Sequence, residues 1–298
     1  AQGLLFAGVE VVRYWFFPLA WWPYILIVDG LVYQRKGSSL LKNHPREFFL
    51  LLPWSVCFWL IFEVFNVVLN NWHYVMVPEN MLQRWVGYAV CYAPVLPGLF
   101  ETMELLDAYG LFKKSRLRPL SGSTRWYVPF VITGLVFLVL PLVWPQFFFP
   151  LVWGIFIFLL EPFNHRSGLR SLMREWQQGT LRTFYLLLVA GAICGLLWEF
   201  WNFWALTKWE YTVPYVGWLK VFEMPILGFF GFPPFAVACY VMMSTVSLLR
   251  QSRGWQDPNK PVSRMRSGLA ILVSIALVTF CLFAFHQIDA HTVATWRP

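Results

Sequence analysis

The stretch Leu196-Leu-Trp-Glu-Phe-Trp-Asn-Phe-Trp204 determines how this chain is interpreted. It places a carboxylate, Glu199, and an amide, Asn202, in an otherwise aromatic run. Residues three apart project from one face of a helix, and Gly195 and Gly191 continue that face toward the N-terminus. Small residues at this spacing let a second helix approach closely within a membrane. We therefore expect the polar pair to face the interior of the protein and not lipid.

A second stretch, Phe62-Glu-Val-Phe-Asn66, repeats the Glu-x-x-Asn pattern between aromatic residues. A Trp-x-Tyr triplet follows each motif: Trp72-His-Tyr74 follows the first and Trp209-Glu-Tyr211 the second. We interpret residues 1–146 and 147–298 as two tandem copies of one four-helix unit. Because each unit has an even number of spans, the copies have the same orientation, related by an axis along the membrane normal.

The composition excludes a soluble globular protein. Hydrophobic side chains make up 58% of the 298 residues and charged side chains 13%, whereas soluble chains carry roughly 25% charged residues. Several apolar runs reach the length of about 20 residues that a membrane-spanning helix needs. The predicted class is an all-α polytopic membrane protein that is rich in aromatic residues.

Apolar runs and their polar ends predict eight spans. Residues 1–12 are expected to form a short interfacial segment, and residues 216–230 a re-entrant or interfacial piece, because glycines and prolines interrupt the run that follows. The spans are expected at about 14–33, 48–69, 85–106, 127–144, 147–163, 184–204, 232–249 and 267–285.

The net charge of +8 is concentrated in alternate loops, which argues against a nucleic-acid partner. Most of the 23 Lys and Arg residues fall in four loops, at 35–46, 113–125, 166–182 and 250–266. Clustering of this kind is the positive-inside pattern, with anionic membrane lipids as neighbours. It predicts an integral protein of a bacterial inner membrane, with both termini on the outer, periplasmic side.

This topology puts both Glu-x-x-Asn motifs in the outer third of the membrane. The two carboxylates, Glu63 and Glu199, are expected to meet at the interface of the two units, where sites in membrane proteins often form. A carboxyl group surrounded by aromatic rings can keep its proton and act as an acid. Asn66 and Asn202 would fix the orientation of the two carboxyl groups. The structural alternative is that all four side chains only hold helices together by hydrogen bonds.

Aromatic residues near the two motifs are candidate walls of a cavity, whereas many other tryptophans fit ordinary interfacial belts. The five cysteines lie in apolar runs without a metal-binding spacing, and we expect neither a metal nor a cofactor. The candidate substrate-binding residues are Trp59, Trp198, Trp201, Trp204, Tyr74, Tyr211 and Glu223.

One stretch resembles a known family. Cys194-Gly-Leu-Leu-Trp-Glu-Phe200 is similar to the C-x-x-x-W-E-[FV] stretch of the small integral-membrane terpene cyclases of the fungal meroterpenoid type. In that family an intramembrane acidic pair is thought to protonate a prenyl chain or its epoxide. The resemblance covers one helix, and the family has about seven spans where eight are expected here. It implies Glu199 as the acid, with Glu63 as its partner.

Three functions remain open at this stage. The first is an intramembrane enzyme that acts on an isoprenoid or similar lipid, with acid–base chemistry from the glutamates and stabilisation of a developing cation by aromatic faces. The second is a proton-coupled carrier of a small cation. The third is a non-catalytic subunit of a larger membrane complex, which would contact lipid, quinone or pigment and bind other membrane subunits.

Overall fold

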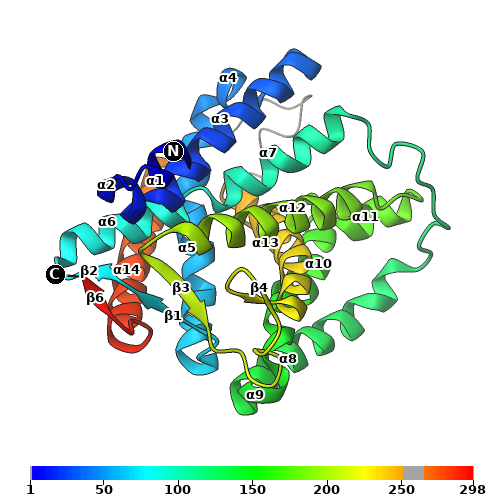
Figure 1. The fold of residues 1–298 in the computed structure, drawn as a ribbon. Helices are drawn as coiled ribbons and strands as arrows, with labels where there is room; N and C mark the ends of the chain where they lie inside the picture. The colour runs from blue at the N-terminus through cyan, green and yellow to red at the C-terminus, as the bar shows by residue number, and fades with distance from the viewer. Residues whose placement is uncertain (1, 251–264, 298) are drawn as a thin grey trace.

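The computed structural model describes residues 2–250 and 265–297, and most of these residues are helical (Figure 1). Three basic residues of the fourth predicted loop, Arg253, Lys260 and Arg264, lie outside the described residues. The described part of the chain contains eight helical runs that are long and apolar enough to cross a membrane. This number agrees with the prediction and is compatible with a membrane protein.

Four of the eight runs are single helices: α3 (Phe16–Lys36), α5 (Pro45–Leu69), α12 (Arg182–Trp204) and α14 (Ser267–His291). The other four are built from consecutive pieces, where proline and glycine interrupt the helix. They are α6 (Met81–Tyr92) with α7 (Val95–Ala108); η1 (Ser123–Trp126) with α8 (Tyr127–Val143); α9 (Pro145–Phe148), η2 (Phe149–Gly154) and α10 (Ile155–Arg166); and η3 (Ile226–Gly231), α13 (Phe232–Val246) and η4 (Ser247–Arg250).

The break between α6 and α7 is closed by a side chain from another helix. Pro94 lacks a backbone N–H, so the regular bonding of the helix stops there. The hydroxyl of Ser55, on α5, donates to the carbonyl of Tyr92 at 2.7 Å and accepts from the backbone N–H of Leu96 at 3.0 Å. Ser55 therefore satisfies both backbone groups at the break and fixes Tyr92 against α5.

Shorter elements connect the spans. Four short helices are α1 (Gln2–Phe6), α2 (Glu10–Tyr14), α4 (Leu40–Asn43) and α11 (Leu172–Gln177). The strands form three two-stranded pairs among the described residues: β1 (Trp72–Val75) with β3 (Lys208–Tyr211), β2 (Val77–Pro78) with β6 (Trp296–Arg297), and β4 (Lys220–Val221) with β5 (Met224–Pro225). The segment expected to be re-entrant or interfacial contains the β4–β5 hairpin and most of η3.

The short helices α1 and α2, the helix α6 and the β2–β6 pair gather at one end of the bundle (Figure 1). In Figure 1 they lie on the same side of the molecule as the two marked chain ends. The backbone of Leu206 donates to the carbonyl of Arg13 at 2.9 Å, and that of Tyr74 donates to the carbonyl of Thr292 at 2.7 Å. These bonds join the N-terminal and C-terminal segments to the two loops that follow α5 and α12.

Helices from opposite sides of residue 146 pack together. The helix α12 lies chiefly against α13 and α7, and α3 lies against α7. The helix α8 packs on α10, while α14 packs on α5. Both α8 and α14 are mostly exposed, as expected for helices that face lipid. The two halves therefore share packing interfaces, because α12 contacts α7 and α14 contacts α5. The division at residue 146 is a hypothesis that the two halves arose by duplication, and it does not mark two separately packed units.

The close helix approach predicted from Gly191 and Gly195 is confirmed. A Cβ atom at Gly191 would lie 2.6 Å from the carbonyl oxygen of Phe232, and one at Gly195 would lie 2.3 Å from the ring of the same residue. Neither position has room for a side chain. This contact between α12 and α13 covers the face that carries Glu199 and Asn202, both of which are fully buried.

Candidate functional site: a two-stranded ribbon over two buried glutamates

The centre of the site is the antiparallel ribbon of β1 and β3, which joins the two loops that follow α5 and α12. Trp72 pairs with Tyr211, and Tyr74 pairs with Trp209. Because alternate residues of a strand point to opposite faces, these four aromatic side chains share one face of the ribbon. His73 and Glu210 share the other face, with 3.7 Å between the His73 Nε2 and a Glu210 carboxylate oxygen.

Each strand is tied to its helix by the asparagine of the Glu-x-x-Asn motif. The Asn66 side chain accepts from the backbone N–H of Trp72 at 3.3 Å and donates to its carbonyl at 2.8 Å. The Asn202 side chain accepts from the backbone N–H of Trp209 at 3.1 Å and donates to its carbonyl at 2.9 Å. The two amides therefore make the same pair of bonds, and their role is to hold the strands in place.

The carboxylate of Glu63 accepts hydrogen bonds from three aromatic side chains. Only 1% of Glu63 is exposed. Its carboxylate accepts from Trp59 Nε1 at 2.7 Å, from Tyr74 Oη at 2.5 Å and from Trp72 Nε1 at 3.2 Å. The Tyr74 oxygen in turn accepts from the hydroxyl of Tyr92 at 2.9 Å. Together these groups form a hydrogen-bonded chain that runs from Tyr92 through Tyr74 to the buried carboxyl group.

Glu199 occupies the matching place below the other strand, with fewer partners. It is fully buried and accepts from the Tyr211 hydroxyl at 2.7 Å, while Trp209 Nε1 donates to the same tyrosine oxygen at 2.8 Å. Its second oxygen, Oε2, has no hydrogen-bond partner in the described chain. The two sites are thus similar in plan, but Glu63 is much better satisfied than Glu199.

The structure brings both glutamates beneath one ribbon without joining them directly. Glu63 bonds to Tyr74, and Glu199 bonds to Tyr211. Within residues 2–250 and 265–297, no hydrogen bond links one carboxylate to the other. The expectation of a shared carboxylate pair therefore stays a prediction, whereas the burial expected of both motifs is confirmed.

Burial raises the pKa of both tyrosines well above their usual range, and the neighbouring glutamate adds to the effect. The cause is the same in each case, because an ionised phenol would lose water and face a carboxylate. Tyr74 and Tyr211 therefore stay protonated at neutral pH. Each can donate a hydrogen bond or pass a proton on, but neither serves as a stable phenolate.

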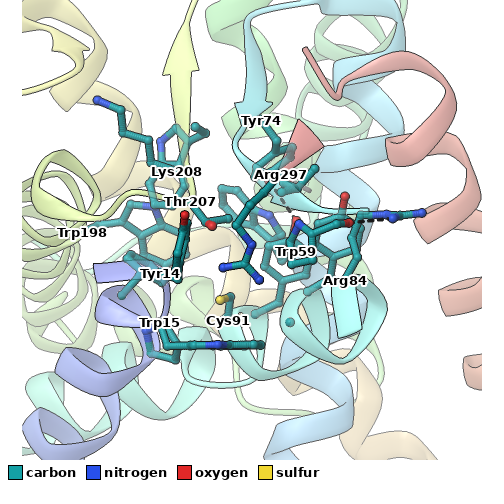
Figure 2. A pocket seen from close by; sticks show the side chains of 18 residues that line it. Tyr14, Trp15, Trp59, Tyr74, Arg84, Cys91, Trp198, Thr207, Lys208 and Arg297 are labelled. Carbon is teal, nitrogen blue, oxygen red and sulfur yellow. Dashed lines mark hydrogen bonds between the residues drawn. The ribbon is translucent and has the colours of Figure 1, made fainter. Parts of the chain in front are cut away.

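An apolar pocket of about 710 Å³, its open mouth included, lies beside Tyr74 (Figure 2). Trp59, Trp198 and Tyr74, predicted as walls, all line it. The other lining residues are Tyr14, Trp15, Phe17, Pro18, Val77, Pro78, Arg84, Gly87, Tyr88, Cys91, Tyr92, Thr207, Lys208, Trp209 and Arg297.

A smaller pocket of about 400 Å³ lies on the side of Tyr211. Trp59 and Trp209 line both pockets, so these two rings separate the Tyr74 pocket from the Tyr211 pocket. The remaining residues of the smaller pocket are Trp72, Trp153, Met224, Gly228, Gly231, Phe232 and Phe235. Among the residues that the structure describes, its lining contains no charged residue, which distinguishes it chemically from the larger pocket.

Three predicted residues lie elsewhere. Trp201 packs its ring against Trp21, with 4.9 Å between centroids. Trp204 is 40% exposed and meets the ring of Phe6. Glu223 forms an ion pair with Lys208, the first residue of β3. None of the three lines either of the two pockets described above, so their predicted contact with substrate has no support from the geometry.

Several residues of the larger pocket were not predicted from the sequence. Arg84, Lys208 and Arg297 bring three positive charges to its lining, and Tyr92 extends the hydrogen-bonded chain to Glu63. Tyr92 ends the stretch Ala89-Val-Cys-Tyr92, which is similar to Ala236-Val-Ala-Cys-Tyr240 in the second half, and this similarity was the only sequence signal for Tyr92. Arg297 carries no signal of its own, because its place depends on the pairing of β6 with β2.

Comparison with protein-family models, with curated proteins and with solved structures finds no match to this chain.

Proposed function

We propose that this protein is a membrane enzyme that acts on an apolar lipid substrate, such as an isoprenoid, by proton transfer through Tyr74 and Glu63. One observation carries the proposal. Tyr74 lines an aromatic pocket and contacts a fully buried carboxyl group at 2.5 Å. Glu63 itself does not line that pocket. Tyr74 is therefore the group that meets the substrate, and Glu63 acts through it.

The chemistry requires the two residues to work as a unit. In the reactive state Glu63 is protonated and donates to the Tyr74 oxygen, so the Tyr74 hydroxyl delivers its proton to a double bond of the substrate while the Glu63 proton passes to the phenol oxygen and leaves a carboxylate. Tyr74 is then never left as a phenolate, which its raised pKa disfavours. A later step returns a proton from the substrate by the same route. Trp59 and Trp198 line the pocket, and aromatic rings of this kind stabilise a developing positive charge.

The carrier of a small cation is less favoured by the same geometry. Arg297 lines the larger pocket without a carboxylate partner among the described residues, and its positive charge would repel a cation there. A non-catalytic role in holding a lipid uses the same apolar walls but needs no proton path. The experiment below separates the two remaining possibilities.

The first test asks whether the pocket holds a lipid. The protein is purified gently, and the lipids retained in wild type and in the variant Gly87→Leu are compared by mass spectrometry. Gly87 lines the pocket, and a leucine side chain at this position would project toward Trp15 and occupy part of the pocket. Gly30→Leu is the matched control, because nothing lies within 4 Å of that position. We expect one retained lipid in wild type and in the control, and its loss in Gly87→Leu.

The second test asks whether the bound lipid reacts. Protein with its retained lipid is incubated in D₂O, and the lipid is examined for carbon-bound deuterium. Proton transfer to and from carbon gives incorporation in wild type, and Tyr74→Phe and Glu63→Gln should each abolish it while the lipid stays bound. A retained lipid without deuterium in wild type would refute the enzyme and favour the holding role.

We also propose that the two halves are related copies. Besides the ribbon, the evidence is a pair of buried carboxylates, Asp29 and Glu161, that make matching hydrogen bonds. Asp29 accepts from the Ser39 hydroxyl at 2.9 Å and from the backbone N–H two residues later at 2.7 Å. Glu161 accepts from the Ser171 hydroxyl at 2.5 Å and from the N–H two residues later at 2.8 Å. Equal contacts at equal spacing support a common origin of these two segments.

The basic loops favour an outer location for the ribbon in the inner membrane of a bacterium. A periplasmic-type reporter should then be active when fused after Tyr74 or Tyr211 and silent after Gly122. The opposite pattern would reverse the orientation and place the candidate site on the inner face.

A further inference from the structure

Two of the three cations that line the larger pocket are neutralised by carboxylates. Arg84 forms an ion pair with Asp289, with 2.7 Å between Nη2 and Oδ2, and also donates to two backbone carbonyls. Lys208 forms an ion pair with Glu223. Figure 2 shows the Lys208 side chain directed away from the centre of the view and Arg84 engaged in its own bonds.

Arg297 differs from these two residues. Its guanidinium group lies in the middle of the pocket between Tyr14 and Trp59 (Figure 2). Its carbon Cζ is 3.8 Å from the centroid of the Tyr14 ring. Among the residues that the structure describes, no carboxylate lies within ion-pair distance of it. The pocket thus holds one positive charge that the described chain does not balance.

The position of this charge is fixed by the backbone. Arg297 belongs to β6, which pairs in parallel with β2, and its carbonyl accepts from the backbone N–H of Glu79 at 3.0 Å. The ring of Tyr14 adds a cation–π contact from the other side. A side chain held at both ends has little conformational freedom to lose when it binds a ligand.

We propose that the larger pocket binds an amphipathic lipid with one anionic head group, a carboxylate or a phosphate, and that Arg297 is the residue that binds this head. The proposal rests on the proposed function and names its substrate class. A guanidinium fork matches the paired oxygens of both head groups, and an apolar surrounding strengthens the attraction. The aromatic walls take the hydrocarbon tail.

The anionic head also answers an electrostatic difficulty in the proposed chemistry. An unbalanced Arg297 would oppose a positive charge that develops on the substrate near Trp59. With the head group bound, the guanidinium charge is neutralised. The head then also fixes which part of the tail reaches Tyr74, because both residues line the same pocket.

The test measures direct binding of radiolabelled probes to the full-length protein in neutral phosphatidylcholine nanodiscs. One set of probes shares a 16-carbon tail: hexadecanol, hexadecanoate and hexadecyl phosphate. A second set shares an isoprenoid tail: farnesol, farnesoate and farnesyl phosphate. Within each set only the head group changes, so the comparison isolates the charge, and the carboxylate and phosphate arms identify the head. Inorganic phosphate should not compete, since it lacks the tail.

We expect at least one anionic probe to bind about 10- to 100-fold more tightly than the alcohol with the same tail, as charge-assisted bonds would give. Arg297→Gln should remove this preference and leave alcohol binding unchanged. Arg297→Lys should retain part of it, because the charge remains and the fork is lost. The control Arg13→Gln removes the same charge from a neighbouring exposed position outside the lining and should have no effect.

The outcomes separate this inference from the proposed function. Equal binding of alcohol and anion, or an anion preference that survives Arg297→Gln, would overturn the inference alone. An Arg297-dependent preference without deuterium incorporation into the bound lipid would support the inference and reject the enzyme. Failure of both probe sets to bind would overturn both.

Discussion

A methyl group at position 191 should destabilise the protein, although alanine favours a helix more than glycine does. The Cβ of Gly191→Ala would lie 2.6 Å from the carbonyl oxygen of Phe232 and 2.9 Å from the Cα of Pro233. Both are backbone atoms, so neither can rotate away. The helices α12 and α13 must move apart to accept the methyl group, and this movement disturbs the packing around Glu199.

The magnitude follows from two opposing effects. Forcing an extra carbon into a packed interface costs about 1–3 kcal/mol. The higher helix propensity of alanine returns up to about 1 kcal/mol. We therefore expect a net loss of about 1 kcal/mol in the free energy of unfolding. At Gly30, on the exposed face of α3, nothing lies within 4 Å, so Gly30→Ala has only the favourable effect. The two substitutions should differ in sign.

The assay is unfolding in mixed micelles by titration with sodium dodecyl sulfate, followed by the fluorescence of the 18 tryptophans. The midpoint should fall for Gly191→Ala and rise or stay unchanged for Gly30→Ala. If both variants shift the midpoint upward by the same amount, α12 and α13 do not pack as closely as described. The burial of the second Glu-x-x-Asn motif would then lose its structural basis.

Three further predictions test other parts of the structure. Asn66→Ala leaves the buried backbone N–H and carbonyl of Trp72 without their side-chain partner. The free energy of unfolding in the same titration should therefore fall by about 1–3 kcal/mol. An unchanged value would mean that the strand does not need this bond to Asn66. The Sγ atoms of Cys57 and Cys281 lie 3.5 Å apart, so copper phenanthroline should join α5 to α14 by a disulfide in wild type but not in Cys281→Ser; absence of the link in wild type would argue against this packing. Because the pKa of Tyr74 is raised in the folded state, the unfolded state loses this proton first, and stability should fall as the pH rises above about 10. Tyr74→Phe should flatten that alkaline decline, and an unchanged slope would count against a buried phenol.

The sequence by itself determined the helical class, the eight apolar runs and the inward direction of the two Glu-x-x-Asn motifs. These features are local, since each depends on residues within one or two helical turns. The face of Gly191, Gly195 and Glu199 could be read directly from its spacing. The absence of a side chain at the two glycines permits the close packing of α12 against α13 that the structure shows.

Only the tertiary structure decided which groups meet at the site. The pairing of Tyr74 with Trp209 joins loops that are far apart in the chain, and it follows from how α5 and α12 are placed by their neighbours. The entry of Arg297 into the pocket depends on the pairing of β2 with β6, two strands that are far apart in the chain. No periodicity in the sequence encodes such contacts, because they are set by the packing of whole helices. The sequence therefore indicated the buried carboxyl groups and Tyr74, whereas packing decided that Tyr74 bonds to Glu63 beside the pocket and brought Arg297 into its lining.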